Sequence, residues 1–319
     1  MKPPRFWFKP KDHFDLRAIL LSPLSWVYRS ATKRRLQSGP RLDVGVPVIC
    51  VGNINMGGTG KTPTVIAILE MLGALDRKAA VISRGYGGTL EGPVLVDEKK
   101  HTAADVGDEP ILLSAFADVW VSKDRALGAK AAVKHGAEVL ILDDGLQNPA
   151  LKYDLSMTVV DAEIGFGNHR VFPAGPLRES VEDGLARTDV IVSVGGNFEH
   201  SNIPVVSGAL HPIEMGMDWK DAHVVAFAGI GRPEKFFRTL KNLGATLEAT
   251  HAFGDHEPYS EMILTRLERE AFQKASILVT TEKDAARLPA DWRHMVMSLP
   301  VRLKFDDPKP LKDRIKSLF

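Results

Sequence analysis

The sequence is poor in cysteine and has no excess of charge of either sign. Cys50 is the single cysteine among 319 residues, so the chain can form neither an internal disulfide nor a zinc site built on cysteines, which fits a reducing compartment. The 41 basic and 40 acidic side chains leave a formal net charge of +1, so no global charge excess indicates nucleic acid as a partner. We find no internal repeat or low-complexity tract, and nothing that indicates an obligate protein partner.

No hydrophobic run near the N-terminus is long enough to span a bilayer as a helix. Residues 18–28 read AILLSPLSWVY without a charge, whereas a spanning helix needs about 20 apolar residues. A cleaved secretory signal is one alternative, but Lys33, Arg34 and Arg35 follow the stretch and no clear small-residue cleavage site separates them. Another alternative is a helix that packs on the protein's own core with a kink near Pro23.

The aromatic and basic side chains around this stretch favour a third interpretation, an element at a membrane surface. Aromatic rings suit the headgroup boundary, and flanking lysine and arginine side chains suit anionic lipids. We therefore expect residues 1–35 to form an amphipathic helical segment that associates with a membrane. The aromatic residues expected at the boundary are Phe6, Trp7, Phe8, Phe14, Trp26 and Tyr28.

The rest of the chain alternates short β-branched runs with helical patterns. Hydrophobic residues make up 44% and charged residues 25% of the chain, and 319 residues suffice for one large or two ordinary domains. Apolar runs separated by helices predict a mostly parallel sheet covered on both faces. The expected strands are 46–51, 79–83, 139–142, 157–160 and 190–194, and the expected helices are 62–75, 109–116 and 123–135.

A second series of strands and helices begins near His223. Its expected strands are 224–228, 245–251 and 277–280, and its expected helices are 233–243, which has proline in the first turn, and 257–274. We place the boundary between the two series in residues 215–221, where the pattern is interrupted. The expected organisation is an N-terminal segment at 1–35, an α/β core at 36–217 and a smaller C-terminal α/β domain at 218–319.

A glycine-rich loop lies between the first expected strand and the first long helix. Residues 52–62 read GNINMGGTGKT, a context in which backbone N–H groups approach phosphate and the helix N-terminus favours negative charge. Lys61 can reach the β- and γ-phosphates, and the Thr62 hydroxyl can bind Mg²⁺. The match to G-x-x-x-x-G-K-[ST] is imperfect because Asn55 stands at the first glycine. The loop nevertheless predicts a P-loop NTPase-like core that binds ATP through Asn55, Met56, Gly57, Gly58, Thr59, Gly60, Lys61 and Thr62.

Two adjacent carboxylates follow the apolar run of residues 139–142. A P-loop needs a carboxylate for Mg²⁺, usually at the end of a neighbouring strand. Asp143 and Asp144 stand at the carboxyl end of such a strand, where the phosphates are expected. The expected metal site is therefore Thr62, Asp143 and Asp144, and the sequence leaves open which aspartate contacts Mg²⁺ directly.

Seven motifs are distributed along the chain: GNINMGGTGKTP (52–63), SRGYGG (83–88), VGDEP (106–110), LDDGLQ (142–147), FPAGPLRE (172–179), FGDH (253–256) and TTEKD (280–284). In this order they resemble the tetraacyldisaccharide 4′-kinase family, the kinases of the lipid A pathway in Gram-negative bacteria. The resemblance runs from about residue 14 to 300. PAGPLRE and SRGYGG are not generic to P-loop proteins, so the resemblance is specific.

The resemblance implies transfer of the γ-phosphate of ATP to the 4′-hydroxyl of a tetraacyldisaccharide 1-phosphate glycolipid at the cytoplasmic face of the inner membrane, with Mg²⁺. It implies an acid/base pair of Asp108 and His256, with Lys61 as a further catalytic residue. A base is needed because a sugar hydroxyl has a very high pKa. The two members of the pair lie in different domains, so we expect domain closure to assemble them. The residues implied to line the cleft are Arg84, Tyr86, Gln147, Asn148, Arg178 and Glu179.

Each of these roles has a structural alternative. Asp108 could cap the helix that follows it, and Asp255 or His256 could be a turn residue before the helix that begins at Pro258. Residues 178–179 could form a surface ion pair, which would contribute little to stability. Residues 283–284 start a helix and are interpreted as structural despite their motif.

Two positions depart from the usual pattern of the resembled family. His169 stands where a glycine is expected, and Asn148 stands where many members have histidine. Neither change removes an expected catalytic group, but both affect the expected contacts to substrate.

Two other functions also use a P-loop. A switch ATPase of the deviant P-loop kind, recruited to the membrane by an amphipathic element, has a similar loop but does not need Asp108, His256 and PAGPLRE in combination. A soluble small-molecule kinase leaves the aromatic and basic N-terminus unexplained. We therefore favour a lipid kinase.

Overall fold

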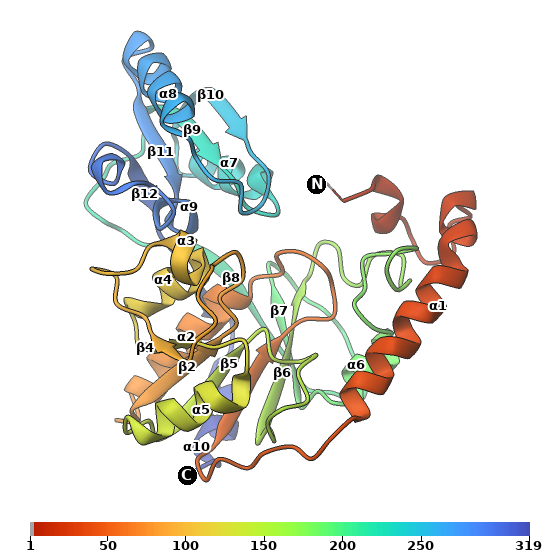
Figure 1. The fold of residues 1–319 in the computed structure, drawn as a ribbon. Coiled ribbons are helices and arrows are strands. Elements are labelled where there is room, and N and C mark those ends of the chain that lie inside the picture. The colour runs from red at the N-terminus through yellow and green to blue at the C-terminus, as the bar shows by residue number, and fades with distance from the viewer. Residues whose placement is uncertain (1–2) are drawn as a thin grey trace.

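Residues 3–319 are described by a computed structural model, in which a smaller α/β unit sits above a larger one in the view of Figure 1. The strands of the larger unit are β1 (Val48–Gly52), β2 (Ala79–Ser83), β3 (Val94–Leu95), β4 (Asp118–Val121), β5 (Val139–Asp143), β6 (Leu155–Asp161), β7 (Val190–Val194), β8 (Val205–Pro212) and β13 (Val301–Phe305). Those of the smaller unit are β9 (His223–Ala228), β10 (Thr246–Ala252), β11 (Ile277–Thr281) and β12 (Met297–Leu299). They pair in the orders β13-β8-β7-β6-β1-β5-β2-β4-β3 and β10-β9-β11-β12.

Helices flank both sheets. The larger unit carries α1 (Leu16–Gln37), α2 (Lys61–Gly73), α3 (Ala103–Val106), α4 (Asp108–Ser114), α5 (Arg125–Lys134), α6 (Val181–Leu185) and α10 (Lys309–Lys316). The smaller unit carries α7 (Pro233–Asn242), α8 (Glu261–Gln273) and α9 (Glu282–Ala285), and the short 3₁₀ helices are η1 (Arg5–Phe8) and η2 (Ala290–Trp292). Apart from the edge strands β3 and β13, neighbouring strands run parallel, which confirms the predicted mostly parallel sheet.

The predicted elements are present, with small shifts at their ends. The strands expected at 79–83 and 190–194 coincide with β2 and β7, and the other expected strands end within two residues of the observed ones. Helix α8 begins at Glu261 rather than at 257, because the Ser260 hydroxyl caps the helix by accepting from the backbone N–H of Ile263. Elements without a prediction are β3, β4, β8, β12, β13, α3, α6 and α10.

Strand β1 lies at the centre of the larger sheet and is buried on both faces. Ile49 and Val51 face the core formed with α2, whereas Val48 and Cys50 face the opposite side of the sheet. Cys50 is fully buried. β1 pairs in parallel with β5, and Val51 lies opposite Asp143 in this register. The end of β5 is thereby placed beside the start of the phosphate loop.

The end of the chain corrects the expected extent of the second domain. β13 pairs antiparallel with β8 of the larger sheet, and α10 buries Leu311 and Ile315 in the core of the larger unit. Residues from Val301 onward therefore belong to the larger unit, although the sequence assigned 218–319 to the smaller one. The local pattern of a strand does not reveal which sheet it joins, because that depends on pairing with residues far away in the chain.

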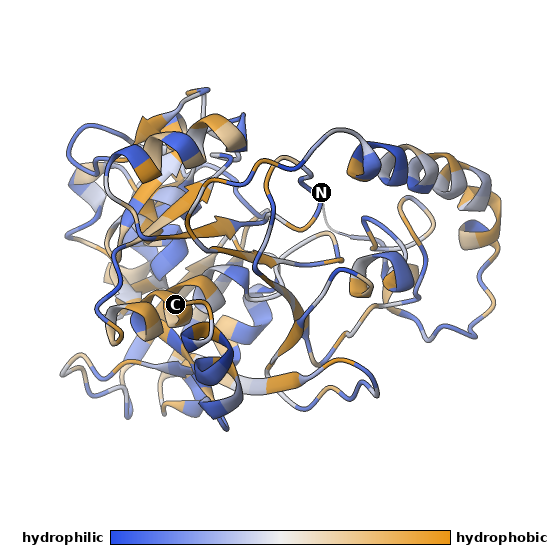
Figure 2. Ribbon diagram, turned by 90° about the horizontal axis from the view of Figure 1, so that it is seen from below, coloured by the Kyte–Doolittle hydropathy of each residue, from blue (hydrophilic) through white to orange (hydrophobic). Residues whose placement is uncertain are grey.

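The N-terminal helix α1 lies along one side of the larger unit and buries small and polar side chains. Ala18, Ser25, Thr32 and Leu36 are its buried residues, and the Ser25 hydroxyl donates to the carbonyl oxygen of Val171 at 2.7 Å. Figure 2 shows the hydrophobic residues of this helix gathered toward its N-terminal end and the hydrophilic ones toward its C-terminal end. None of the helices in residues 3–319 combines the length and the apolar character needed to cross a membrane.

Half of the aromatic residues expected at a membrane boundary fasten this segment to the protein instead. Phe6 is buried, and the rings of Trp7 and Tyr28 pack edge-on against Phe172 at centroid distances of 6.1 and 5.5 Å. The remaining three rings, those of Phe8, Phe14 and Trp26, are exposed by 40%, 73% and 71%. Core packing therefore accounts for the first three aromatics but not for the exposed ones.

Candidate active site

The phosphate loop connects β1 to α2, and hydrogen bonds from its own side chains stabilise its conformation. The Asn53 amide donates to the carbonyl oxygen of Gly57 at 3.2 Å and to the Thr59 hydroxyl at 3.1 Å. Gly57 and Gly60 have φ angles of 106° and 99°, a region that side-chain-bearing residues rarely adopt. Gly60 precedes α2 directly, so the loop ends at a helix N-terminus suited to phosphate.

Lys61 and Asp144 form the charged centre of the loop. The Lys61 ammonium lies 3.2 Å from the Asn53 amide oxygen and 3.5 Å from the Asp144 carboxylate, to which Arg178 also donates at 2.8 Å. Burial alone would raise the pKa of Asp144, but Lys61 and Arg178 outweigh it and lower the pKa to about 2. Asp144 has a φ of 54°, which turns the chain immediately after β5.

Asp143 behaves in the opposite way although it is the next residue in the chain. Its side chain is buried, and its Oδ1 atom has no hydrogen-bond partner within residues 3–319. Burial, reinforced by the nearby charges of Glu109 and Asp144, raises the pKa of Asp143 to about 7. A buried carboxylate oxygen without a partner is costly unless a cation or donor completes it. This atom therefore fits a metal ligand.

Glu109 joins the phosphate loop to the smaller unit. Its carboxylate accepts a hydrogen bond from the Thr62 hydroxyl at 3.4 Å and from the Lys283 ammonium of α9 at 3.0 Å. Burial would raise the pKa of Glu109, but Lys283 and Lys61 lower it. Burial would likewise lower the pKa of Lys283, but Glu109 and Asp108 raise it. The two side chains are thus held as an ion pair across the two units.

Asp108 and His256 meet across the same boundary. The Nδ1 atom of His256 lies 2.9 Å from one Asp108 carboxylate oxygen and 3.0 Å from the other. A carboxylate accepts only, so Nδ1 carries the proton, and Nε2 is the nitrogen that can accept one. His256 has a φ of 59° and packs edge-on against the Tyr86 ring, with centroids 5.4 Å apart. The expected pair is thus already in contact in this structure.

The alternative roles of these two residues can be compared with their geometry. Asp108 is the first residue of α4 and Gly107 occupies the N-cap position, but the Asp108 carboxylate also accepts a hydrogen bond from the backbone N–H of Glu109 at 3.0 Å, so it supports the start of the helix as well. His256 does lie in a turn, and its backbone N–H donates to the carbonyl oxygen of Gly229 at 3.3 Å. The turn conformation is compatible with the contact between its ring and Asp108.

A cavity of about 240 Å³ lies between the two units at the phosphate loop. The larger unit contributes the loop from Gly58 to Thr62 together with Glu109, and the smaller unit contributes Lys283 and Arg232. A Cβ atom at Gly231 would come within 3.2 Å of the Gly58 nitrogen, so the units approach closely at the tip of the loop. The cavity has the position that a bound nucleotide requires.

The first two residues of the expected ATP-binding stretch are tied elsewhere. The Asn55 amide donates to the carbonyl oxygen of Gly165 at 3.0 Å, and the Met56 N–H donates to that of Pro176 at 2.7 Å. The bond of Asn55 ties the loop to the segment after β6, and that of Met56 ties it to the PAGPLRE segment. Met56 and Asn55 therefore position the loop, whereas Gly58 to Thr62 line it.

The residues expected to line the cleft fall into two groups. Arg178 and Tyr86 touch the charged centre and His256, respectively. Gln147 instead donates to the Asn53 carbonyl oxygen and to the Glu179 carboxylate, both at 2.9 Å, and thus supports the loop from behind.

The remaining three expected residues lie apart from the charged centre. Glu179 is buried and bonds Arg187 at 2.8 Å, so residues 178 and 179 pair with other partners and not with each other. The Asn148 side chain accepts from the N–H of Ala150 at 2.8 Å and stabilises its own turn. Arg84 is exposed and makes no hydrogen bond or ion pair within residues 3–319.

Two residues in the site have no role in the sequence analysis. Glu109 lies in the VGDEP motif beside Asp108, and Lys283 was interpreted as structural because it starts a helix. A signal for Lys283 was available, since a cation in the first turn opposes the helix dipole. Asp284 does have the structural role that was expected, because its buried carboxylate accepts from the Gly229 N–H and the Tyr259 hydroxyl.

A metal ion at the phosphate loop would have few side-chain ligands. Within the described residues, no group of three or more His, Cys, Asp and Glu side chains is arranged to hold a metal ion by itself. Mg²⁺ does not require such a group, because it commonly uses one or two carboxylates together with substrate phosphates and waters. Asp143 with the Thr62 hydroxyl is a donor set of that kind.

Comparison with known proteins gives the family. The profile of the family described as tetraacyldisaccharide-1-P 4′-kinase matches residues 17–319. The chain belongs to this family. Relatives named tetraacyldisaccharide 4′-kinase from Jannaschia sp. and Dinoroseobacter shibae are each 52% identical to it, over 99% and 100% of this chain and 98% of theirs. The crystal structure of LpxK from Aquifex aeolicus in complex with ATP is 28% identical, covers 96% of this chain and 100% of its own, and has a TM-score of 0.78.

Membership in the 4′-kinase family confirms the resemblance stated from the seven motifs. The P-loop kinase fold and the assignment of the chain as an ATP-dependent 4′-kinase of lipid A biosynthesis are confirmed with it. The two other functions considered from the sequence, a switch ATPase and a soluble small-molecule kinase, are not the function of this family.

Proposed function

We propose that this chain transfers the γ-phosphate of ATP to the 4′-hydroxyl of a tetraacyldisaccharide 1-phosphate through the residues gathered between its two units. The observation that carries the proposal is the contact of Asp108 with His256, 2.9 Å across the boundary, beside the cavity at the phosphate loop. An acid/base pair next to a nucleotide cavity serves transfer to a hydroxyl, whereas a switch ATPase has no need of it.

The nucleotide phosphates are bound by the loop and its cations. Gly58 to Thr62 line the cavity, where their backbone N–H groups would bind phosphate oxygens, and Lys61 exchanges its contact with Asp144 for the β- and γ-phosphates. Asp143 and the Thr62 hydroxyl are the residues that would hold Mg²⁺, since the Asp143 Oδ1 atom has no other partner within residues 3–319. When bound, Mg²⁺ supplies charge neutralisation at the phosphate oxygens.

The Asp108–His256 pair accepts the proton of the sugar hydroxyl. The hydroxyl oxygen forms the new bond to the γ-phosphorus, the bond from that phosphorus to the β–γ bridging oxygen breaks, and ADP leaves. Nε2 of His256 takes the proton. The Asp108 carboxylate keeps its hydrogen bond from Nδ1–H and stabilises the resulting imidazolium. Arg178 is placed by Asp144 to neutralise charge on the transferring group.

The acyl chains of the acceptor imply that the enzyme works at a membrane, and α1 is the element suited to contact it. Leu20, Leu24 and Val27 are 69%, 58% and 60% exposed, although they are large apolar side chains on a helix packed against the protein. Basic residues occupy the C-terminal half of the same helix. An exposed apolar stretch next to basic residues fits a helix in the interfacial plane of an anionic membrane. We infer a peripheral location at the cytoplasmic face of the bacterial inner membrane.

Incubation with γ-labelled ATP, Mg²⁺ and the tetraacyldisaccharide 1-phosphate tests the transfer. We expect the label to move with the glycolipid on thin-layer chromatography. Label that appears only as free phosphate would refute the kinase assignment and indicate an ATPase. The His256→Ala variant is the matched control, because it should abolish transfer without preventing ATP from binding at the phosphate loop.

A further inference from the structure

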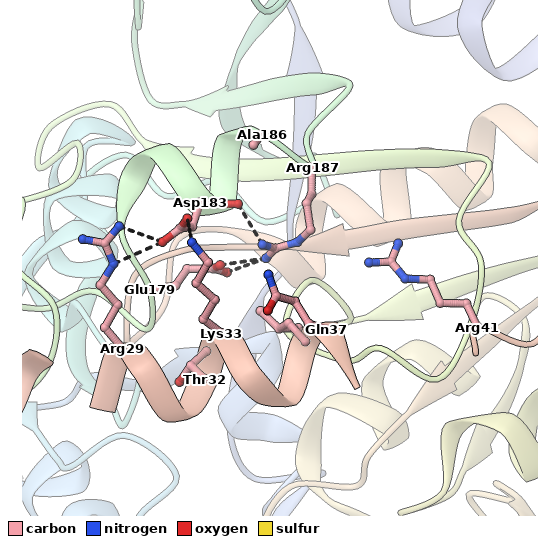
Figure 3. A pocket seen from close by; sticks show the side chains of 10 residues that line it. Arg29, Thr32, Lys33, Gln37, Arg41, Glu179, Asp183, Ala186 and Arg187 are labelled. Atoms are coloured by element: carbon pink, nitrogen blue, oxygen red, sulfur yellow. Dashed lines mark hydrogen bonds and ion pairs between the residues drawn. The ribbon is translucent and has the colours of Figure 1, made fainter. Parts of the chain in front are cut away.

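A second cavity, separate from the nucleotide cavity, lies between the C-terminal half of α1 and α6. Its volume is about 170 Å³, which equals roughly five or six waters at about 30 Å³ each. Figure 3 shows side chains from both helices and from the chain after α1 directed toward it. The residues that line it are Arg29, Thr32, Lys33, Leu36, Gln37, Arg41, Glu179, Asp183, Ala186 and Arg187.

Positive charge exceeds negative charge around this cavity. Four cationic side chains and two carboxylates line it, which leaves an excess of two positive charges. Asp183 pairs with Arg29 at 2.9 Å and with Lys33 at 3.5 Å, so one carboxylate is shared by two cations. The buried Glu179 pairs with Arg187 at 2.8 Å.

Arg41 is the cation that this arrangement leaves without a partner. It is exposed and makes no hydrogen bond or ion pair within residues 3–319, and Figure 3 shows its guanidinium on the side of the cavity that Arg187 also faces. Arg187 is already neutralised by Glu179, so Arg41 is the guanidinium of this cavity that would gain from a bound anion. The planar fork of arginine binds the oxygens of phosphates and carboxylates bidentately.

The position of the cavity on α1 indicates where such a phosphate would come from. The exposed apolar residues of α1 occupy its N-terminal half, and the cavity lies against its C-terminal half. From Leu20 to Lys33 the distance along the helix axis is about 20 Å. A helix in the interfacial plane keeps both halves at the depth of the lipid headgroups. The cavity lies on the side of α1 that packs on the protein, where Thr32 and Leu36 are buried, so the exposed side chains of Lys33 and Arg41 are the cations there that can reach headgroup phosphates.

We propose that this cavity binds the phosphate of an anionic phospholipid headgroup, with Arg41 and Lys33 as its outer ligands, while Arg187 stays paired with Glu179. The site rests on the proposed membrane contact of α1 and extends it from general attraction to a specific headgroup. The 1-phosphate of the acceptor carries related chemistry, so the experiment must separate these two sources.

The test compares two double variants that remove the same charge from neighbouring positions. Lys33→Gln with Arg41→Gln removes the outer ligands, and Arg34→Gln with Arg35→Gln removes two exposed cations of the same helix that do not line the cavity. Glu179 and Arg187 stay intact, because Glu179 also bonds Gln147 behind the phosphate loop. Each protein is sedimented with vesicles of phosphatidylcholine, with and without phosphatidylglycerol.

We expect the preference for phosphatidylglycerol vesicles to fall about 10- to 30-fold in the cavity variant and less than about threefold in the control variant. Glycerophosphoglycerol, the soluble headgroup, should bind the wild type and the control by calorimetry but not the cavity variant. Equal losses in both variants would overturn the proposal, because they would show attraction to surface charge alone.

Two further outcomes separate the proposal from the assumptions on which it rests. If the wild type binds neither kind of vesicle, the membrane contact of α1 is refuted, and failure of the soluble headgroup to bind then refutes the cavity as well. If the cavity variant binds phosphatidylglycerol normally but raises KM for the glycolipid in detergent without phospholipid, the cavity holds the acceptor's 1-phosphate. That result would overturn the phospholipid assignment while leaving the kinase function intact.

Discussion

Replacing Asp143 with asparagine should make the protein more stable and inactive at the same time. The carboxyl group is buried and lacks a partner at Oδ1 within residues 3–319, and its pKa is raised from 3.8 to about 7. Asparagine has nearly the same shape and no charge. The Asp143→Asn variant therefore removes the free-energy cost of a buried charge, together with the carboxylate that we propose for Mg²⁺.

The size of the gain follows from the two pKa values and depends on pH. Because the folded-state pKa is raised, the wild type loses stability as pH rises from about 4 to about 7, at about 1.4 kcal/mol per pH unit. The variant does not titrate at this position. Its advantage over the wild type should thus be roughly 2 kcal/mol near pH 5 and about 4 kcal/mol near pH 8, as an upper limit.

Urea denaturation followed by circular dichroism, with a chelator present, measures this difference. Asp144→Asn is the matched control, since its pKa of about 2 means that the charge stabilises the folded state above about pH 4 and loses that effect as pH falls through about 2. The control should be less stable than the wild type at both pH values, by no more than about 2 kcal/mol because its side chain is 31% exposed. An Asp143→Asn advantage that is absent, or equal near pH 5 and pH 8, refutes the reasoning.

Three other perturbations test the proposed roles. Asp108→Ala and His256→Ala should each lower kcat by about 10²- to 10⁴-fold with little change in ATP affinity, whereas lost nucleotide binding would indicate structural damage. Lys283→Met should raise the pKa of Glu109 and move the acidic limb of the kcat–pH profile to higher pH, and a purely structural lysine would change only the unfolding midpoint. Leu20→Ser with Leu24→Ser should weaken vesicle binding about 10- to 100-fold at an unchanged unfolding midpoint, and unchanged sedimentation would exclude α1 as the contact.

The local arrangement around the phosphate loop could be predicted because each step of it is encoded by nearby residues. A β-branched run, a glycine-rich loop with Lys61 and an apolar helix predicted β1, the loop and α2, and the run before Asp143 predicted β5. The pairing of His256 with Asp108 was predicted from the family resemblance and not from the local sequence pattern. The φ of 57° at His169 explains why a glycine is expected there, since glycine adopts this conformation most easily, but it does not explain the histidine.

Features that depend on contacts between distant residues could not be predicted from local sequence patterns. The return of β13 to β8 is decided by pairing between segments about ninety residues apart, and no local pattern records it. The ion pair of Lys283 with Glu109 joins two units, so its significance emerges only when the units are placed together. The aromatic residues show the same limit, because Phe6 and Trp26 look alike in sequence and differ in what covers them.

The ion pairs of the site also explain why nucleotide and metal should bind together. Asp143, Asp144 and Glu109 bring three carboxylates to the phosphate loop, and a triphosphate alone would be repelled by them. Lys61 can leave Asp144 for the phosphates because Arg178 stays paired with Asp144, whereas Asp143 forms no ion pair within residues 3–319 and needs the metal. ATP affinity should therefore rise when Mg²⁺ is supplied, and the rise should shrink in Asp143→Asn, which has lost a carboxylate that both repels phosphate and attracts the metal. A gain from Mg²⁺ that is the same in the wild type and the variant would place the metal elsewhere.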